Sequence, residues 1–364
     1  MSRPKNKVLF YSNLPSGGAK NTMLSTSKYL NSFYRVQKIS DPKYKISNFF
    51  QYMFTALFSS PKYQHRAVEL KRVFDILIVY QSWLVKTPDI IRYTDKPKIY
   101  ICHDSLREYY DHDHIAIQSF KDKVVNLLRL PIKWRDKKNI SSNNLTIITN
   151  SHFSKEIIRK AYDRDSLVIY PGINTSKYLS ATLIDKKDQI ISVGAINKFK
   201  RQSFYLDVVG QIPANRRPTL VLIGNGADKQ YLSLLKSKAL KNSVTLKILL
   251  NATEYTKINE LRKSKAYIYA PVSEPFGLSV VEALSVGLPI VAYKYGGGYA
   301  EIISNKSGII IDTLDTKTWA NQVQKLLSDN NYGKYYNYNK TLAKTNFDEK
   351  RMNTQIHKLI QQTL

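Results

Sequence analysis

Cysteine is nearly absent from this chain of 364 residues, and acidic residues are scarce. A single cysteine, Cys102, excludes a framework of intramolecular disulfides and suits a reducing compartment. Long apolar runs are missing as well, since no stretch approaches the roughly 18 uninterrupted apolar residues of a membrane span. The apolar run at residues 8–11 is too short for the core of a signal peptide. We therefore expect a cytoplasmic protein, soluble or at most peripheral on the inner face of a membrane.

The scarcity of acidic residues leaves a large positive charge. Asp and Glu total 28 against 56 Lys and Arg, which gives a formal net charge of +28. This balance favours polyanionic partners, which include nucleic acid, an anionic membrane surface and phosphorylated small molecules. Hydrophobic residues at 43% and charged residues at 23% are typical of a folded protein and exclude disordered and fibrous classes. At roughly 150 residues per domain, the length predicts two domains.

Short β-rich runs recur along the chain, and each is followed by a turn and a helical pattern. They lie at residues 8–11, 76–80, 99–102, 145–149, 190–193, 220–223, 244–249, 266–270, 290–293 and 309–311. Short apolar strands that alternate with helices indicate βαβ units and parallel sheets buried on both faces. The predicted fold class is therefore α/β with doubly wound, Rossmann-like sheets. Residues 43–72 show no clear strand.

A break at Tyr170-Pro171-Gly172 separates the two halves. It predicts a first domain at residues 1–171 and a second domain at residues 172–345. We expect the last helix, at about residues 346–364, to pack back on the first domain. Two such sheets joined by a hinge would leave a ligand cleft between the carboxyl ends of their strands.

The strongest chemical signal is a pair of glutamates eight positions apart, Glu274 and Glu282. The first lies in a loop after the apolar strand that ends at Ala270, and the second lies in a helix that we expect to begin near Ser279. Free amides at the start of a helix form a natural phosphate site. Both carboxylates could face one ligand, and a carboxylate can hold the two hydroxyls of a ribose. Taken alone, the pair could equally be a helix-surface charge and a first-turn residue favoured by the helix dipole.

This segment resembles the Glu-x7-Glu motif of retaining glycosyltransferase family 4, the group 1 glycosyltransferases, which have the GT-B fold. Further segments resemble that family at residues 149–155, 168–174, 191–194, 221–226 and 295–301. The resemblance implies two Rossmann-like domains that face each other across a cleft. It also implies that the second domain binds a nucleotide-diphosphate sugar.

The resemblance implies roles for residues of the motif and of a basic loop. Glu274 would contact the donor sugar, and Glu282 would hold the ribose. Backbone amides would contact the sugar and phosphate at Phe276, Gly277, Leu278 and Ser279. In the loop at residues 194–201, Lys200 fits the family pattern, but Ala195 stands where an Arg is expected. Lys198 or Arg201 would then supply the missing charge; the alternative is a solvated basic loop.

In the first domain, Gly17 and Gly18 form a turn that resembles the family's Gly-Gly loop at the cleft. Lys20 stands where that loop often has an acidic residue. His103 follows a predicted strand and resembles the family's His close to the reacting sugar, so we assign it to catalysis with Glu274 and Lys200. A lone turn and a lone histidine are otherwise most often structural.

A metal site is the alternative for the segment Asp111-His112-Asp113-His114. It contains the Asp-x-Asp pattern of the other main glycosyltransferase fold, which also recurs at residues 163–165. The Glu-x7-Glu half of the chain does not belong to that fold, and the resemblance implies no metal. We expect no cofactor beyond the nucleotide-diphosphate sugar as co-substrate.

An aromatic run at residues 48–58 lies within the basic first half, and residues 120–138 are basic and partly amphipathic. Such stretches can lie in an anionic membrane interface, or they can be helices packed on the first domain with their basic faces in water. No nucleic-acid motif is recognisable, which makes that class of partner the weaker one.

The resemblance implies transfer of a hexose, with mannose or glucose as guesses, to an acceptor hydroxyl with retention at the anomeric carbon. The acceptor would be a glycan, on a lipid or at a surface. Ala195 and Lys20 leave open a degenerate, glycosyltransferase-like binding protein. A basic α/β protein that binds nucleic acid is the remaining alternative.

Overall fold

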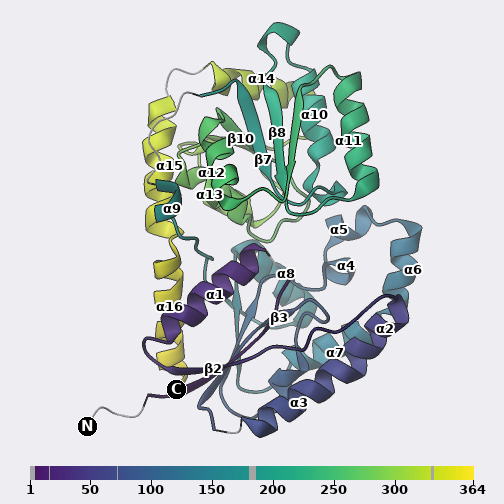
Figure 1. Cartoon of the computed structure of the whole chain (residues 1–364), viewed down its shortest axis with the longest axis vertical. Coiled ribbons are helices and arrows are strands. Elements are labelled where there is room, and N and C mark those ends of the chain that lie inside the picture. Colours follow the sequence, from purple (N-terminus) through teal and green to yellow (C-terminus); the bar gives the residue numbers. More distant parts are fainter. Residues whose placement is uncertain (1–4, 16, 72, 180–185, 329–331) are drawn as a thin grey trace. The chain divides into compact units, whose positions relative to one another are not determined.

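The computed structural model describes residues 5–15, 17–71, 73–179, 186–328 and 332–364. The chain divides into two compact units (Figure 1). Unit 1 comprises Met1–Gly172 together with Glu349–Leu364, and unit 2 comprises Ile173–Asp348. Each unit contains one parallel sheet covered by helices, which confirms the predicted α/β class.

The sheet of unit 1 has the strand order β2-β1-β3-β4-β5-β6. Its strands are β1 (Lys7–Asn13), β2 (Arg35–Ile39), β3 (Ile76–Ser82), β4 (Lys98–Cys102), β5 (Leu145–Thr149) and β6 (Leu167–Val168). All neighbouring pairs are parallel. The helices of this unit are α1 (Gly18–Leu30), α2 (Phe49–Phe54), α3 (Ser60–Leu70), α4 (Arg107–Tyr110), α5 (His112–Ala116), α6 (Phe120–Leu128), α7 (Leu130–Ile140), α8 (His152–Tyr162) and α16 (Glu349–Thr363).

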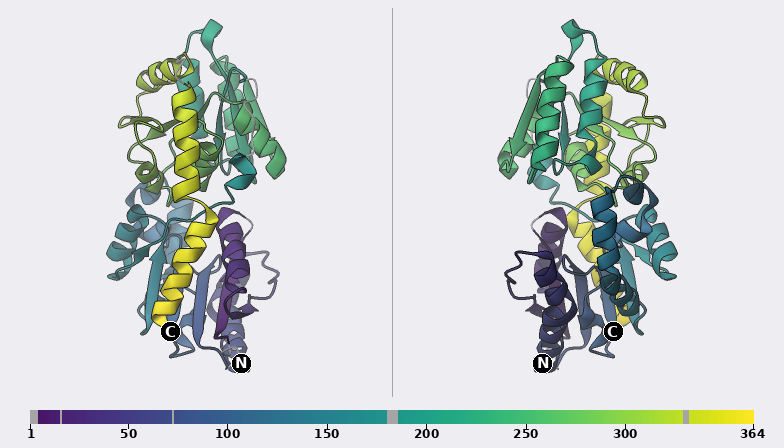
Figure 2. Two further views of the ribbon diagram at one scale, coloured as in Figure 1. Left: turned by 90° about the vertical axis from the view of Figure 1, so that its left-hand side faces the viewer. Right: turned by 90° about the vertical axis from the view of Figure 1, so that its right-hand side faces the viewer.

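Alternation along the strands of unit 1 builds a core on each face of the sheet. Leu9 and Leu77 point to the face covered by α3 and α8. Their neighbours Val8 and Ile78 point to the opposite face, where they pack against α1 and α16. Helix α16 lies beside α1 (Figure 2), and Thr26 of α1 donates to Asn353 of α16 at 2.8 Å. The last helix of the chain thus completes the core of unit 1.

The sheet of unit 2 has the order β12-β11-β10-β7-β8-β9, again with parallel pairs. Its strands are β7 (Gln189–Val193), β8 (Thr219–Gly224), β9 (Leu246–Leu250), β10 (Ala266–Tyr269), β11 (Ile290–Tyr293) and β12 (Gly308–Ile311). The helices are α9 (Ser176–Leu179), α10 (Gln202–Gly210), α11 (Lys229–Lys241), α12 (Glu254–Lys263), α13 (Leu278–Ser285), α14 (Thr316–Leu327) and α15 (Tyr332–Asn346). Within unit 2 the chain first forms β7 and adds β8 and β9 on one side of it. It then crosses over, so that β10 pairs with the other side of β7.

The sequence analysis did not list two strands, β2 and the two-residue β6, and it named helices only as one alternative within residues 43–72. Strand β2 lies at the edge of its sheet and exposes Arg35, so it lacks a continuous apolar run. Within residues 43–72, helix α2 continues through a five-residue π-helical turn, Thr55–Ser59, into α3. Strand β9 begins at Leu246 rather than at Val244, since the residues before it form a turn after α11.

Candidate active site

The loops that follow β7 and β10 are neighbours in unit 2, although about seventy residues separate them. Strand order reverses between these two strands, and ligands of open α/β sheets bind where the order reverses. The amide of Val272, after β10, donates to the carbonyl of Phe199, after β7, at 2.7 Å. One backbone hydrogen bond therefore joins the two loops that carry most of the predicted donor-site residues.

Lys200 and Glu274 form an ion pair across these loops. Their side chains are 22% and 17% exposed, so the pair is partly shielded but still open to solvent. Two residues that the sequence analysis assigned to one site are thus in direct contact. The pair places a cation and a carboxylate together where the strand order reverses.

A glycine-rich loop after β11 holds the backbone of Glu274. The amide of Glu274 donates to the carbonyl of Gly296 at 2.8 Å, and the amide of Gly298 donates to the carbonyl of Glu274 at 2.8 Å. Gly297 has φ +135°, and a Cβ there would lie 2.1 Å from the Glu274 carbonyl oxygen. Only glycine fits this approach. The sequence analysis cited this loop as a resemblance but did not assign it the role of holding Glu274.

Helix α13 begins at Leu278, one residue before the predicted start, and Gly277 precedes it with φ +86°. The left-handed conformation at Gly277 turns the chain into the helix. The amides of the first turn of a helix have no intrahelical acceptor. Ser279 receives a 2.8 Å hydrogen bond from the buried Tyr267 hydroxyl, whereas Phe276 is 3% exposed and lies in the core. Helix α13 therefore begins within one residue of the predicted position, and phosphate binding by its first turn stays a prediction.

Glu282 is held by two residues that the sequence analysis missed. Its Oε1 accepts the Tyr178 hydroxyl at 3.1 Å and the Lys257 ammonium at 2.5 Å. Burial, followed by the nearby carboxylate of Glu282, raises the pKa of Tyr178 far above its usual range, so the phenol remains a donor. The Glu282 side chain is only 15% exposed, which argues against a free charge on the helix surface.

The basic side chains of the loop after β7 have different neighbours. Lys198 is exposed and lies over the ring of Phe199 at 5.4 Å. Arg201 has φ +50°, lies 5.7 Å from the ring of Tyr293 and donates to the carbonyl of Ala270 at 3.4 Å. Arg201 thus reaches the carboxyl ends of β10 and β11, whereas Ala195, at the position of the expected Arg, adds no charge.

In unit 1, Gly17 precedes α1 with φ +153°, and Gly18 is its first residue. A Cβ at Gly17 would meet no atom within 4 Å, so the conformation rather than crowding favours glycine there. Both glycines lie at the carboxyl end of β1, as the sequence analysis expected for a ligand loop. Lys20 lies in the first turn of α1.

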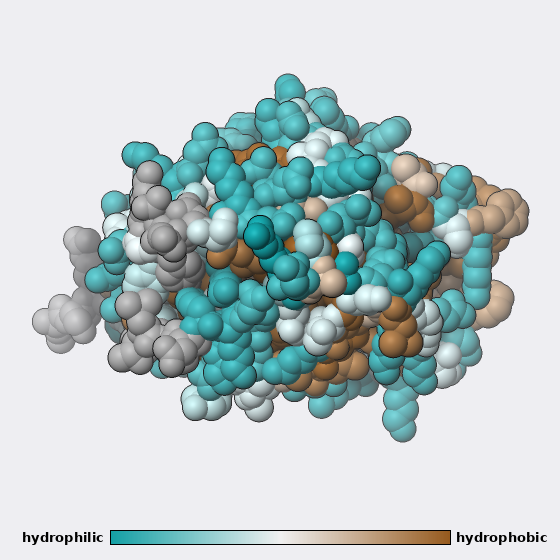
Figure 3. All heavy atoms as spheres, turned by 90° about the horizontal axis from the view of Figure 1, so that it is seen from above, coloured by the Kyte–Doolittle hydropathy of each residue, from teal (hydrophilic) through white to brown (hydrophobic). Residues whose placement is uncertain are grey.

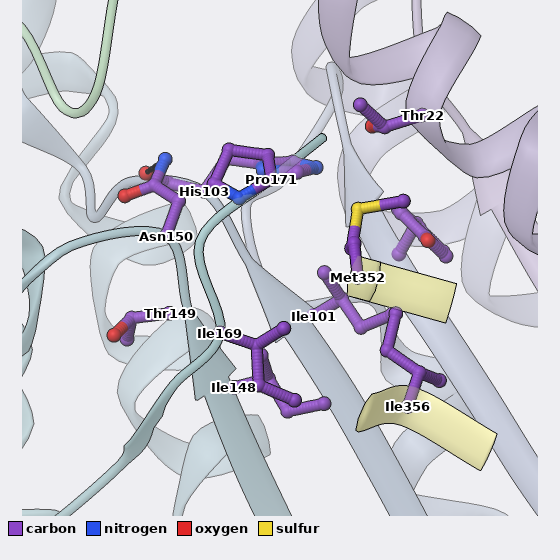
Figure 4. Close-up of a pocket in the computed structure, with 11 residues that line it drawn as sticks. Thr22, Ile101, His103, Ile148, Thr149, Asn150, Ile169, Pro171, Met352 and Ile356 are labelled. Carbon is purple, nitrogen blue, oxygen red and sulfur yellow. Dashed lines mark hydrogen bonds between the residues drawn. The ribbon is translucent and has the colours of Figure 1, made fainter. Parts of the chain in front are cut away.

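His103 directly follows β4 and lines a small pocket in unit 1. Figure 4 shows His103 and Asn150 at one end of this pocket and isoleucines such as Ile148 at the other. The His103 backbone donates to Gln81 at 3.1 Å and accepts from Asn150 at 2.9 Å. Its Nε2 is buried and has no hydrogen-bond partner in the described part of the chain. Burial lowers the pKa of His103 to about 4, so the ring is neutral near pH 7.

Asp104 and the segment from Asp111 to His114 have local partners. Asp104 pairs with Lys86 at 2.7 Å, and this ammonium, despite opposing burial, lowers the pKa of the carboxyl. Asp111 caps α5 through the His114 amide at 3.1 Å, and the side chain of His112 is 97% exposed. Among the residues that the structure describes, no group of three or more His, Cys, Asp or Glu side chains could hold a metal ion.

Comparison with known proteins finds a family model that matches part of the chain. Residues 176–343 match the family model described as glycosyl transferases group 1. The chain is 22% identical over 298 residues to an alpha-1,3/1,6-mannosyltransferase of Dictyostelium discoideum, covering 70% of this chain and 67% of that protein. It is 24% identical to an alpha-monoglucosyldiacylglycerol synthase of Acholeplasma laidlawii, covering 59% of this chain and 57% of that enzyme. The matches span from 13% to 67% of the length of the first curated relatives.

A solved structure resembles the whole chain. The Anabaena protein HepE in complex with UDP and glucose has a TM-score of 0.74 at 16% identity, and the match covers 98% of this chain and 100% of that one. At this identity the likeness concerns the fold. Residues 176–343 thus match the group 1 glycosyl transferase family model, and the chain has the GT-B fold of two Rossmann-like units.

Proposed function

We propose that this chain transfers a hexose from a nucleotide-diphosphate sugar to an acceptor hydroxyl. One observation carries the proposal: Lys200 and Glu274 form an ion pair where strand order reverses, just before α13 begins at Leu278, within the residues that match the family model. Cations and helix amides at such a place can stabilise the charge that develops on a leaving diphosphate.

The donor would lie along the carboxyl edge of the unit 2 sheet. In this proposal Glu282, fixed by Lys257 and Tyr178, accepts the ribose hydroxyls through its second oxygen. The amides of the first turn of α13, with Lys200 and Arg201, hold the diphosphate, and Glu274 contacts the sugar. The ion pair with Lys200 would open or rotate as the ligand enters, because the cation is required by the phosphate.

We propose UDP-glucose as the first donor to test and GDP-mannose as the second. The likeness to the HepE complex with UDP and glucose supports the former, and the mannosyltransferase relative supports the latter. Retention would follow if the leaving phosphate takes the acceptor proton on the same face of the sugar. His103 would present a neutral ring nitrogen near the reacting sugar, where an imidazolium would oppose the oxocarbenium-like charge.

We propose that no metal ion is needed for this reaction. Lys198, Lys200 and Arg201 lie within four consecutive residues of the loop after β7, and together with the helix amides they could balance the diphosphate. Transfer that is unchanged by a chelator and is not increased by added divalent ions would agree with this arrangement. Loss of transfer on chelation would overturn it.

We propose a lipid-linked or surface glycan as the acceptor and a location on the inner face of a membrane. Two observations support this part. The net charge of +28 suits an anionic surface, and the Acholeplasma relative is named for a glycolipid product. Among the residues searched, no helix is long and apolar enough to cross a bilayer.

The donor site can be tested by thermal unfolding with UDP-, GDP- and ADP-sugars in enough salt to suppress non-specific anion binding. A donor at 100 times its dissociation constant adds about 2.7 kcal/mol, which raises the melting temperature by several degrees. Glu282→Ala should abolish the shift. Glu254→Ala is the matched control, because Glu254 is a 51% exposed acid on α12 that pairs with Lys177. Equal shifts with every polyanion, unchanged in Glu282→Ala, would refute the proposal and favour a degenerate binding protein.

A further inference from the structure

A row of exposed phenylalanines lies on one helical segment of unit 1. Phe50, Phe54 and Phe58 are 82%, 62% and 61% exposed. Their spacing of four residues places them on one face of α2 and of the π-helical turn that continues it. The opposite face is anchored, since Ala56 is fully buried in a cluster with Ile132 of α7. We call these three phenylalanines the first stripe.

A second stripe lies on α6 and α7. Its members are Phe120 (83% exposed), Val124 (43%), Leu127 (65%), Leu128 (55%) and Trp134 (67%). Positions 120, 124 and 127 follow the helical repeat, so they share one face of α6. A monomeric protein rarely exposes so many large apolar side chains on adjacent elements without a partner.

The helices that carry the two stripes pack on each other. Arg129, between α6 and α7, donates to the Tyr52 hydroxyl at 3.0 Å and lies over that ring at 5.4 Å. Arg135 of α7 donates to the carbonyl of Leu57 at 2.5 Å. Figure 3 shows brown spheres at the surface along the right-hand edge of the molecule. The stripes thus belong to one group of helices.

The charge around the stripes is almost entirely positive. Between Asp41 and Glu69 the sequence contains no acidic residue, but it contains Lys43, Lys45, Lys62 and Arg66. Residues 120–138 contain seven basic residues and two acidic ones, of which Asp136 is fully buried. The exposed lysines of this region are Lys43, Lys45, Lys62, Lys121, Lys123, Lys137 and Lys138.

We propose that the two stripes and their exposed lysines form a docking surface for an anionic lipid bilayer. Phenylalanine, leucine and tryptophan side chains enter the boundary between headgroups and acyl chains, while lysines reach the anionic headgroups. A second copy of this chain fits less well, because a self-complementary contact would bring lysines against lysines. The inference extends the proposed lipid-linked acceptor, but its test involves no sugar.

The test is flotation of the full chain with vesicles of phosphatidylcholine, or of phosphatidylcholine with 30% phosphatidylglycerol, at 0.15 M salt. We expect binding to the anionic vesicles to be at least tenfold stronger. Phe50→Ser/Phe54→Ser/Phe58→Ser and, separately, Phe120→Ser/Leu127→Ser should each reduce that binding tenfold or more. Leu234→Ser/Leu240→Ser is the matched control, since these leucines of α11 in unit 2 are 51% and 83% exposed. The control should bind within twofold of the unmodified chain.

Because the replaced side chains are exposed, all variants should melt at the same temperature as the unmodified chain. Equal binding to neutral and anionic vesicles would overturn the inference, and so would stripe variants that bind as well as the control. A dimer in sedimentation that the stripe variants dissolve would also overturn it, in favour of a second copy. Donor-dependent thermal shifts should survive in the stripe variants, and vesicle binding should survive in Glu282→Ala, so the two proposals can fail separately.

Discussion

Gly297→Ala is the sharpest test of how the fold positions Glu274. Gly297 has φ +135° and ψ −164°, a conformation that is nearly restricted to glycine and costs other residues about 1–3 kcal/mol. An added Cβ would lie 2.1 Å from the Glu274 carbonyl oxygen and 2.5 Å from its amide nitrogen. Both atoms belong to backbone that is hydrogen-bonded to this same loop, so neither can move without breaking those bonds.

The strain and the overpacking, about 1–3 kcal/mol for the latter, add to roughly 3 kcal/mol or more. For a unit of this size that loss lowers the melting temperature by roughly 6–12 °C. If the loop instead shifts to relieve the clash, Glu274 moves away from Lys200 and donor affinity falls. We therefore expect Gly297→Ala to lower the melting temperature, to weaken the donor-dependent thermal shift, or to do both.

Gly226→Ala is the control, because it alters a neighbouring loop in which an added Cβ would meet no atom within 4 Å. The free energy of unfolding of that variant should lie within about 1 kcal/mol of the value for the unmodified chain. A small gain in stability is also compatible, because alanine restricts the unfolded state. The measurement is thermal unfolding of both variants with and without donor. A Gly297→Ala protein that melts and binds donor like Gly226→Ala would refute the reasoning.

The other predictions concern single side chains. Lys257→Met should raise the donor KM at least tenfold, because Glu282 loses the ammonium that orients it; Lys263→Met, at the end of the same helix, should leave KM unchanged, and equal effects would contradict this role. Ala195→Arg should tighten nucleoside diphosphate binding several-fold in a titration without changing stability, since Ala195 is exposed; weaker binding would show that the site is already neutralised. Burial holds His103 neutral with a pKa of about 4, below the usual value near 6.5, so the unfolded chain binds the extra proton between these values. Stability should therefore fall as pH drops from about 6.5 to 4, and His103→Gln should flatten that part of the pH profile, whereas replacement of the exposed His112 should leave it unchanged.

Strand positions could be predicted well where burial on both faces produces a continuous apolar run. β5 and β11 have the bounds that the sequence suggested, because their residues are almost all buried. The edge strand β2 was not predicted, because Arg35 is exposed and its neighbours are partly exposed, so the strand lacks a continuous apolar run. Helix α2 was only one of two alternatives for a related reason: its exposed phenylalanines obscure the usual contrast between a buried apolar face and a polar one.

The motif singled out two glutamates as candidate site residues but did not indicate which side chains hold them. Glu274 and Glu282 stand out because proline and glycine mark the loop and helix around them. Their partners are distant in sequence, since Tyr178 and Lys257 lie 104 and 25 positions from Glu282. No local sequence pattern predicts such contacts, because they depend on which elements the fold places side by side.

The two glutamates share an electrostatic arrangement that explains how acidic residues can serve a site for an anion. Glu274 pairs with Lys200 and Glu282 pairs with Lys257, so each carboxylate is matched by an ammonium. Arg201 adds a further positive charge to the loop after β7. A diphosphate would therefore meet a site of net positive charge, although the groups proposed to bind the ribose and the sugar are carboxylates. Replacing Lys257 or Lys200 alone would remove that balance as well as a contact, which is why we expect losses at these positions to exceed the effect of one hydrogen bond.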